Sequence, residues 1–370
     1  MIFKDREILK AMVPPEDMIA FRSEQIKMAS LIFNNLMKGV SGSSLICYGT
    51  PGSGKTMTML KLKQDYEFKL KQGDKIIYVN TRKHPTEMQL LSAITEKLKF
   101  PVRSRSISKY YSVLSQILKG TNCVMILDEI DVVIQRSGDH VLNNLWELRN
   151  SIKANISLIM ITNDITFLDL LEARVKSRLQ PFKIMFSPYN ASELYELLVR
   201  RAKSAFEEEA VPDGVIRKIA AIIAQETGDA REAFSLLEKT GNLAEEQESS
   251  ILSAELVDKA LKFVELNEIS YLIKTLPRQT KIVLRIIINL QERGSDQIFY
   301  SDVYNEYYKI YESYGVRLLT SRRIIDLLWQ LAMSGVINTK YSSTRKGRTK
   351  TVLLQFPIDI LDRILKSEGI

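Results

Sequence analysis

A glycine-rich segment near residue 50 carries the clearest chemical signal in this chain. Gly49, Thr50, Pro51, Gly52, Ser53, Gly54, Lys55 and Thr56 match the phosphate-binding pattern G-x-x-x-x-G-K-[ST]. In such a loop, backbone N–H groups and the N-terminus of the next helix bind phosphate oxygens. Lys55 would reach the β- and γ-phosphates of a nucleoside triphosphate, and Thr56 would hold Mg²⁺. An apolar run at 44–48 and a helix-like segment at 57–71 flank the loop, as this geometry requires.

Two adjacent carboxylates follow a second apolar run. Residues 124–127 are apolar, and Asp128 and Glu129 come directly after them. Asp128 would hold Mg²⁺ beside Thr56, and Glu129 would polarise the attacking water. Adjacent acids also occur in ordinary surface turns. The preceding phosphate-binding loop favours the catalytic interpretation.

Further polar residues follow in an informative order. Asn163 ends the apolar run 159–162, where it could bind a γ-phosphate or the water, or simply form a turn. With the two motifs above, this order resembles AAA+ ATPases, in which such a residue is called sensor 1. In that class an arginine reaches a neighbouring subunit's nucleotide, and both Arg174 and Arg178 are candidates. Arg231, at an expected helix start, occupies the sensor 2 position of that class.

The segments that must position these residues indicate an α/β fold. Between residues 44 and 188, strand-like runs alternate with helical patterns, which predicts a mostly parallel sheet. We expect its strands at 44–48, 75–80, 123–127, 157–162 and 182–186. The first forty residues look helical only around 22–38. We therefore expect an AAA+ P-loop NTPase core over residues 1–189.

A helical lid is expected over residues 190–269. The capping box at 190–193 begins its first helix, and later helices should end near Gly228 and Gly241. The polar segment 244–250 is typical of a loop. Beyond it, residues 270–370 should form a separate domain.

The pattern of this last domain predicts an α+β winged helix-turn-helix. Helices are expected over 277–292, from Ser301 to about 313, and from Thr320 or Ser321 to Gly335. Strand-like runs at 336–341 and 351–356 follow, joined by a basic connection. Three helices and a β-hairpin make up this fold.

Charge supports a DNA-binding role for this domain. It holds 16 Lys and Arg against 9 Asp and Glu, a balance of +7 out of +8 for the chain. Candidate contacts to duplex DNA lie at the third helix and in the hairpin: Ser321, Arg322, Arg323, Arg345, Lys346, Arg348 and Lys350. Winged helices also bind proteins, but a local basic excess favours a polyanion.

The remaining composition excludes several classes of protein. A chain of 370 residues should hold more than one domain, and no apolar run approaches the length that spans a bilayer. Residues 1–7 mix charges and lack the apolar core of a signal peptide. We expect an intracellular, cytoplasmic and nucleoid-associated protein without a membrane partner. Cys47 and Cys123 lie in apolar runs and should be buried thiols, and the two histidines are far apart in sequence.

The chain as a whole resembles the archaeal origin-recognition and replication-initiator family. That family is similar to eukaryotic origin-recognition subunits and to the initiation factor that loads the replicative helicase. The segments that carry the resemblance, beyond the motifs above, are 3–9, 13–16, 21–26, 228–231 and 319–323.

The resemblance implies further site residues and partners. Val13, Pro14 and Arg22 would lie near the adenine, and Arg103 and Arg105 would belong to a helical insertion that touches DNA. Arg174 matches the family's arginine finger better than Arg178. The implied partners are origin duplex DNA, the minichromosome maintenance (MCM) helicase and a paralogous initiator on the same origin. Bound ADP and slow hydrolysis, used as a switch, are also implied.

Two other functions remain open from the sequence. A clamp-loader-like or other remodelling AAA+ ATPase would turn over ATP in a closed oligomer, although clamp loaders lack a winged helix. A nucleotide-regulated transcription factor would bind promoters and have no helicase partner.

Overall fold

The computed structural model describes residues 2–10, 21–40, 43–152, 154–294, 297–344 and 347–370. The chain divides into two compact units, Met1–Val257 and Asp258–Ile370, each with its own hydrophobic core. The domain boundaries expected near residues 190 and 270 stay predictions.

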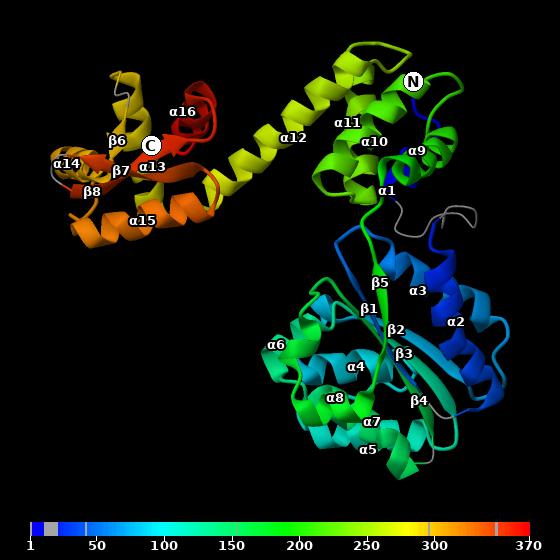
Figure 1. Cartoon of the computed structure of the whole chain (residues 1–370). Coiled ribbons are helices and arrows are strands. Elements are labelled where there is room, and N and C mark those ends of the chain that lie inside the picture. The colour runs from blue at the N-terminus through cyan, green and yellow to red at the C-terminus, as the bar shows by residue number, and fades with distance from the viewer. Residues whose placement is uncertain (1, 11–20, 41–42, 153, 295–296, 345–346) are drawn as a thin grey trace. The chain divides into compact units, whose positions relative to one another are not determined.

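The first unit contains a five-stranded parallel sheet in the order β2-β3-β4-β1-β5 (Figure 1). Its strands are β1 (Ser44–Gly49), β2 (Lys75–Asn80), β3 (Asn122–Asp128), β4 (Asn155–Thr162) and β5 (Phe182–Phe186). All five predicted strands are confirmed, and with them the α/β fold. Because parallel strands end at a common edge, the residues that follow β1, β3 and β4 meet at one place.

Helices cover both faces of this sheet (Figure 1). On one face lie α2 (Ser23–Lys38) and α3 (Lys55–Glu67), whose apolar side chains share a core with β1 and β3. The other face is covered by α4 (Glu87–Lys97), α5 (Ile107–Ile117), α6 (Asp131–Ser137), α7 (His140–Ile152) and α8 (Ala173–Leu179). Cys47 and Cys123 are buried free thiols, as predicted.

The helical part of the first unit comprises α9 (Ala191–Ala205), α10 (Asp213–Glu226) and α11 (Ala230–Glu246), with α1 (Glu7–Lys10) packed on α9 and α11. The capping box at Asn190 is confirmed. The predicted helix end near Gly241 is wrong, since α11 continues to Glu246 and takes in part of the expected loop. A Cβ at Gly241 would lie 2.4 Å from the Phe3 ring, so glycine there permits close packing rather than ending the helix.

The second unit begins within α12 (Ala254–Thr275), which starts in the first unit. It contains α13 (Arg278–Glu292), α14 (Tyr300–Ile310), α15 (Ser321–Met333), α16 (Ile358–Ser367) and the antiparallel strands β6 (Ile298–Phe299), β7 (Ile337–Thr344) and β8 (Gly347–Leu354). The strands lie in the order β6-β8-β7, so the predicted three-helix and hairpin arrangement is confirmed, with α16 and β6 added.

Three details of the second unit differ from, or refine, the prediction. Thr320 is the N-cap of α15, because its side-chain oxygen accepts a hydrogen bond from the Arg323 backbone N–H. Ser301 does not cap α14, which begins one residue before it. The hairpin strands are longer than predicted, since Ser342 pairs with Thr349 inside the expected connection.

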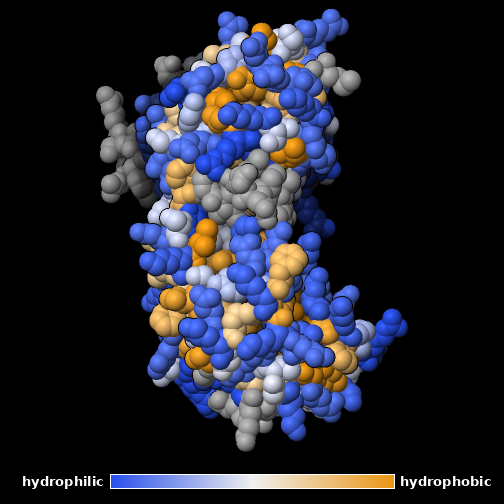
Figure 2. Space-filling model, turned by 90° about the vertical axis from the view of Figure 1, so that its right-hand side faces the viewer, coloured by the Kyte–Doolittle hydropathy of each residue, from blue (hydrophilic) through white to orange (hydrophobic). Residues whose placement is uncertain are grey.

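On the face seen in Figure 2, hydrophilic side chains predominate and hydrophobic ones form small groups. Within the described part of the chain, no helix has both the length and the apolar character needed to cross a bilayer.

Candidate nucleotide-binding site

The glycine-rich loop joins the end of β1 to the start of α3 and has the backbone expected of a phosphate cradle. Gly49 and Gly52 have φ of 149° and 64°, which other residues rarely adopt. A Cβ at Gly49 would lie 2.1 Å from the backbone oxygen of Phe186, and one at Gly52 would lie 1.6 Å from Oδ1 of Asp229. With these neighbours in place, both positions therefore require glycine.

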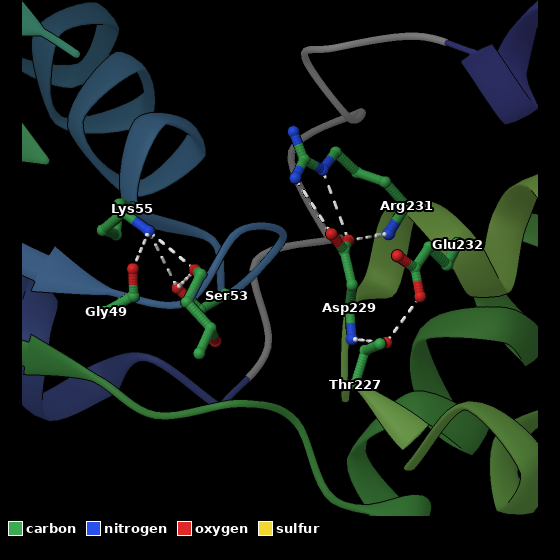
Figure 3. A network of polar contacts seen from close by, with 8 residues as sticks. Gly49, Ser53, Lys55, Thr227, Asp229, Arg231 and Glu232 are labelled. Atoms are coloured by element: carbon green, nitrogen blue, oxygen red, sulfur yellow. Dashed lines mark hydrogen bonds and ion pairs between the residues drawn. The ribbon is translucent and has the colours of Figure 1, made fainter. Parts of the chain in front are cut away.

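Lys55 lies inside this loop (Figure 3). Its Nζ donates hydrogen bonds to the backbone oxygens of Gly49 at 2.8 Å and Thr50 at 2.7 Å, and to Oγ of Ser53 at 3.3 Å. Burial lowers the pKa of the Lys55 ammonium to about 8, although the Asp128 carboxylate opposes this shift. The ammonium is therefore held where phosphate oxygens could replace neutral acceptors.

A hydroxyl and a carboxylate meet beside this loop. Thr56 Oγ1, from the start of α3, donates to Oδ2 of Asp128 at 2.9 Å, and Asp128 ends β3. Mg²⁺ in nucleotide sites is commonly held by one or two protein oxygens together with phosphates. The Thr56 and Asp128 side chains fit that requirement. Tyr78 donates to the same carboxylate oxygen at 2.7 Å.

Glu129 follows Asp128 in a constrained position. Its φ is 55°, and its backbone oxygen accepts a 2.5 Å hydrogen bond from Oγ1 of the buried Thr81. The carboxylate lies 3.6 Å from the Arg82 guanidinium. Burial raises the pKa of the Glu129 carboxyl, while Arg82 opposes the rise. A partly buried carboxylate fixed in this way is suited to orienting a water molecule.

Asn163 directly follows β4, which is the neighbour of β3, and its side chain is exposed.

The two candidate finger arginines differ in their surroundings. Arg178 donates to Oδ1 of Asn143 at 2.6 Å and forms an ion pair with Glu147. Arg174 is exposed, and the described residues provide it with neither a hydrogen bond nor an ion pair. Arg174 is thus the one available to a neighbouring molecule.

Arg231 lies at the start of α11, where Asp229 is the N-cap (Figure 3). Its guanidinium donates to the Asp229 carboxylate at 2.9 Å and 3.3 Å, and this hydrogen bonding raises the pKa of Arg231. Asp229 in turn touches Gly52 of the phosphate-binding loop. The predicted sensor-type arginine is therefore held beside the loop by a carboxylate.

Arg22 occupies a structural position next to the loop. It is 4% exposed, and its Nε donates to the backbone oxygen of Ser53 at 2.9 Å while Nη2 donates to that of Ser187 at 2.8 Å. The guanidinium carbon lies 3.9 Å from the centre of the Tyr189 ring. The Arg22 donors thus link the phosphate-binding loop at Ser53 to the segment that follows β5 at Ser187. Val13 and Pro14 lie outside the described residues.

Sequence reasoning missed three contributors to this site: Tyr78, Asp229 and Tyr189. Tyr78 lies two residues before the end of the predicted strand 75–80, and only the pairing of that strand with β3 brings it close to Asp128. Asp229 precedes a predicted helix, and Asp is a favoured N-cap. Nothing in the sequence pointed to Tyr189.

The candidate DNA contacts are surface residues where they are described. Arg103 and Arg105 are exposed in the segment before α5, and Arg103 lines a hollow of about 850 Å³ with Ser104 and Lys109. Ser321, Arg322 and Arg323 are exposed at the N-terminal end of α15. In the hairpin, residues 348 and 350 lie on β8, whereas Arg345 and Lys346 are outside the described residues.

Helix α15 also exposes apolar side chains that the sequence analysis did not single out. Ile325, Trp329 and Met333 follow at intervals of four residues and are 47%, 59% and 68% exposed. Arg322 lies on the same side of the helix, because its angular position falls between those of Ile325 and Met333.

Three family models match this chain. Residues 40–171 match an AAA domain, 195–262 a Cdc6 AAA+ ATPase-type lid domain, and 271–363 a CDC6 C-terminal winged helix domain.

Similar proteins agree with these models. An ORC1-type DNA replication protein of Pyrococcus abyssi is 35% identical, with 95% of this chain and 87% of that protein covered. One of Archaeoglobus fulgidus is 33% identical, with 99% and 91% covered. The solved structure of Aeropyrum pernix ORC1 in complex with DNA superimposes with a TM-score of 0.79 at 29% identity, covering 100% of this chain and 97% of that one.

Proposed function

The chain belongs to the family of ORC1-type DNA replication proteins, and from this premise we propose that it is a nucleotide-switched initiator that binds origin duplex DNA. It combines an AAA+ core and lid with a C-terminal winged helix. The proposal depends on the presence of two sites in one chain. Lys55, Thr56 and Asp128 form a site for phosphates and magnesium. Arg322 and Arg323 form an exposed cationic helix end.

In the nucleotide site, ATP or ADP binds the loop of residues 49–56. Lys55 exchanges its bonds to the Gly49 and Thr50 backbone oxygens for phosphate oxygens, a change from neutral to charged acceptors. Thr56 and Asp128 would hold Mg²⁺, which would supply positive charge to the phosphates. Arg231 exchanges its Asp229 partner for the nucleotide and so couples α11 to the bound state.

Hydrolysis needs a water and an additional positive charge. Glu129 orients the water, and Asn163 lies at the end of the adjacent strand. Arg174 supplies a finger to a neighbouring subunit, which its exposed and unengaged guanidinium supports. An isolated molecule therefore hydrolyses ATP slowly, and the nucleotide acts chiefly as a switch.

In the DNA-binding unit, α15 enters the major groove with Ser321, Arg322 and Arg323 at its leading end. The basic hairpin contacts the phosphate backbone beside the groove. Arg103 and Arg105, which are exposed before α5, add contacts from the first unit. The relative whose structure is described as an ORC1 protein in complex with DNA supports this mode.

The family membership also supports two protein partners. On the origin, the protein recruits or helps to load the MCM helicase, and it shares the site with a paralogous initiator. Both partners rest on resemblance to the family, so they are tested after DNA binding.

Footprinting tests the proposal. Origin-proximal DNA from the source genome is incubated with the full chain at about 0.1 M salt, where contacts from basic side chains to phosphates are strong. We expect protection of discrete repeats, and less protection with Arg322→Ala/Arg323→Ala than with the control Arg363→Ala, an exposed arginine on α16. If no origin fragment were protected, the proposal would be overturned.

A further inference from the structure

Within the described part of the chain, three hydrogen bonds hold the Asp128 carboxylate. Its Oδ2 accepts the Thr56 hydroxyl at 2.9 Å and the Tyr78 phenol at 2.7 Å. Its Oδ1 accepts the backbone N–H of Glu129 at 3.0 Å. A carboxylate offers about four acceptor positions, so the donors among the described residues leave one open, on Oδ1.

Tyr78 comes from a different strand than the group it binds. It lies on β2, which pairs with β3 in a register that sets Tyr78 opposite Ile126 and Asn80 opposite Asp128. The phenol therefore reaches along the sheet edge to the carboxylate two residues further on. This placement depends on strand pairing and not on the loop that holds the phosphates.

Tyr78 can act only as a donor to Asp128. The side chain is half-buried, and its phenol has a single O–H, which it donates to Oδ2 of Asp128. Thr56 differs from Tyr78 because it belongs to the phosphate-binding loop and would itself hold the metal.

We propose that Tyr78 is a positioning residue for Mg²⁺: together with Thr56 and Glu129 it fixes the Asp128 carboxylate so that one acceptor position remains for the metal or its water. The inference rests on the proposed nucleotide function and names a residue outside the phosphate-binding and carboxylate motifs. Partners that orient a metal-binding carboxylate commonly change metal affinity by about 10–100-fold when removed.

The test replaces Tyr78 by phenylalanine, which removes the hydroxyl and keeps the ring. Release of a fluorescent ADP analogue is measured against Mg²⁺ concentration and in EDTA. We expect the Mg²⁺ concentration for half-maximal retention to rise about 10-fold in Tyr78→Phe. Release in EDTA and the melting temperature in EDTA should stay unchanged, and excess Mg²⁺ should restore slow release.

Tyr48→Phe is the matched control, because Tyr48 lies on β1 and the described residues give its hydroxyl no hydrogen bond. An unchanged Mg²⁺ midpoint in Tyr78→Phe would overturn the inference. If Tyr78→Phe reduced retention of the ADP analogue equally in EDTA and in Mg²⁺, the inference would also be overturned, since Tyr78 would then shape the nucleotide pocket. If the unaltered protein retained no nucleotide, the proposed function itself would fail, so the two failures are distinguishable.

Discussion

The nucleotide site and the DNA-facing end of α15 use cations in opposite ways. In the first unit, Lys55 and Arg22 are 5% and 4% exposed, and backbone oxygens hold both. In the second unit, Arg322 and Arg323 are exposed at a helix end, and Arg323 approaches the Asp326 carboxylate only to 3.8 Å. The protein's own backbone fixes the cations of the first site, whereas those of the second act through charge that the solvent screens. The two should therefore respond differently to mutation and to salt.

The largest effect is expected for Lys55→Ala. Loss of a buried, hydrogen-bonded charge from a binding site costs about 2–5 kcal/mol, which is roughly 30-fold to several thousand-fold in nucleotide affinity. Since DNA binding depends on phosphate contacts made elsewhere, it should change less than about three-fold. Fluorescent-nucleotide titration and DNA gel shifts on the same preparation measure both. Complete loss of DNA binding would mean that the nucleotide orders the DNA surface.

Replacement of Arg22 by methionine tests the role of the buried cation behind the loop. The Ser53 and Ser187 oxygens would lose their donors, which should lower the free energy of unfolding by about 2–4 kcal/mol. Nucleotide affinity should fall with it. Lys27→Met, at an exposed position on α2, is the control in thermal melts. Equal melting temperatures for the two variants would contradict the structural role.

The exposed cations of α15 should be recognised by their salt dependence. Arg322→Ala/Arg323→Ala is expected to weaken DNA binding about 10-fold at 0.1 M salt and to reduce the log–log salt slope by about one for each phosphate that the variant no longer neutralises. Nucleotide affinity should not change. Binding isotherms at four salt concentrations, with Arg363→Ala beside them, give the slope. An unaltered slope would place the DNA-binding cations elsewhere.

The second unit also contains a buried cation, Arg285, which predicts a pH effect. Arg285 and Lys366 hydrogen-bond to the Asp362 carboxylate and hold its pKa below the ordinary value. The unfolded chain therefore binds a proton at the Asp362 carboxyl more readily than the folded chain does. The ion pairs of Asp362 stabilise the fold above about pH 4, and this stabilisation is lost as the pH falls through the pKa of Asp362 in the folded chain. Asp362→Asn should flatten the fall in melting temperature between about pH 5 and 3. Asp359→Asn, exposed on the same helix, should not.

The smallest effect concerns the apolar side chains of α15. If Ile325 and Trp329 enter the groove beside Arg322, they meet the 5-methyl groups of thymine. Loss of one buried methyl costs about 0.8 kcal/mol, roughly four-fold in affinity. Competition between thymine-containing and deoxyuracil-containing origin duplexes measures this. Trp329→Ala should reduce the preference, and an unchanged preference would place this face away from the bases.

The sequence predicted those parts of the site that depend on local spacing. The loop at 49–56 and the acids at 128 and 129 were predictable because each motif directly follows a strand. Arg22 could be placed near the nucleotide only by resemblance, because its acceptors lie 31 and 165 residues away. Tyr78 was missed because its contact with Asp128 depends on which strands pair.

The fold shows the same division between local and distant determinants. Strand-like runs that alternate with helical patterns predicted all five strands of the first unit. The helix end at Gly241 was predicted wrongly, because the reason for that glycine is the Phe3 ring from the far end of the unit. Helix α16 was also missed. Its Asp362 contacts Arg285 of α13, which lies 77 residues earlier in the chain.

The close approach of Gly52 and Asp229 has an evolutionary consequence. Any side chain at position 52 would collide with the carboxylate that caps α11. Among related initiators, a residue other than glycine at position 52 should therefore occur only together with a smaller residue at position 229. These two positions, one in the nucleotide loop and one in the lid, should vary as a pair.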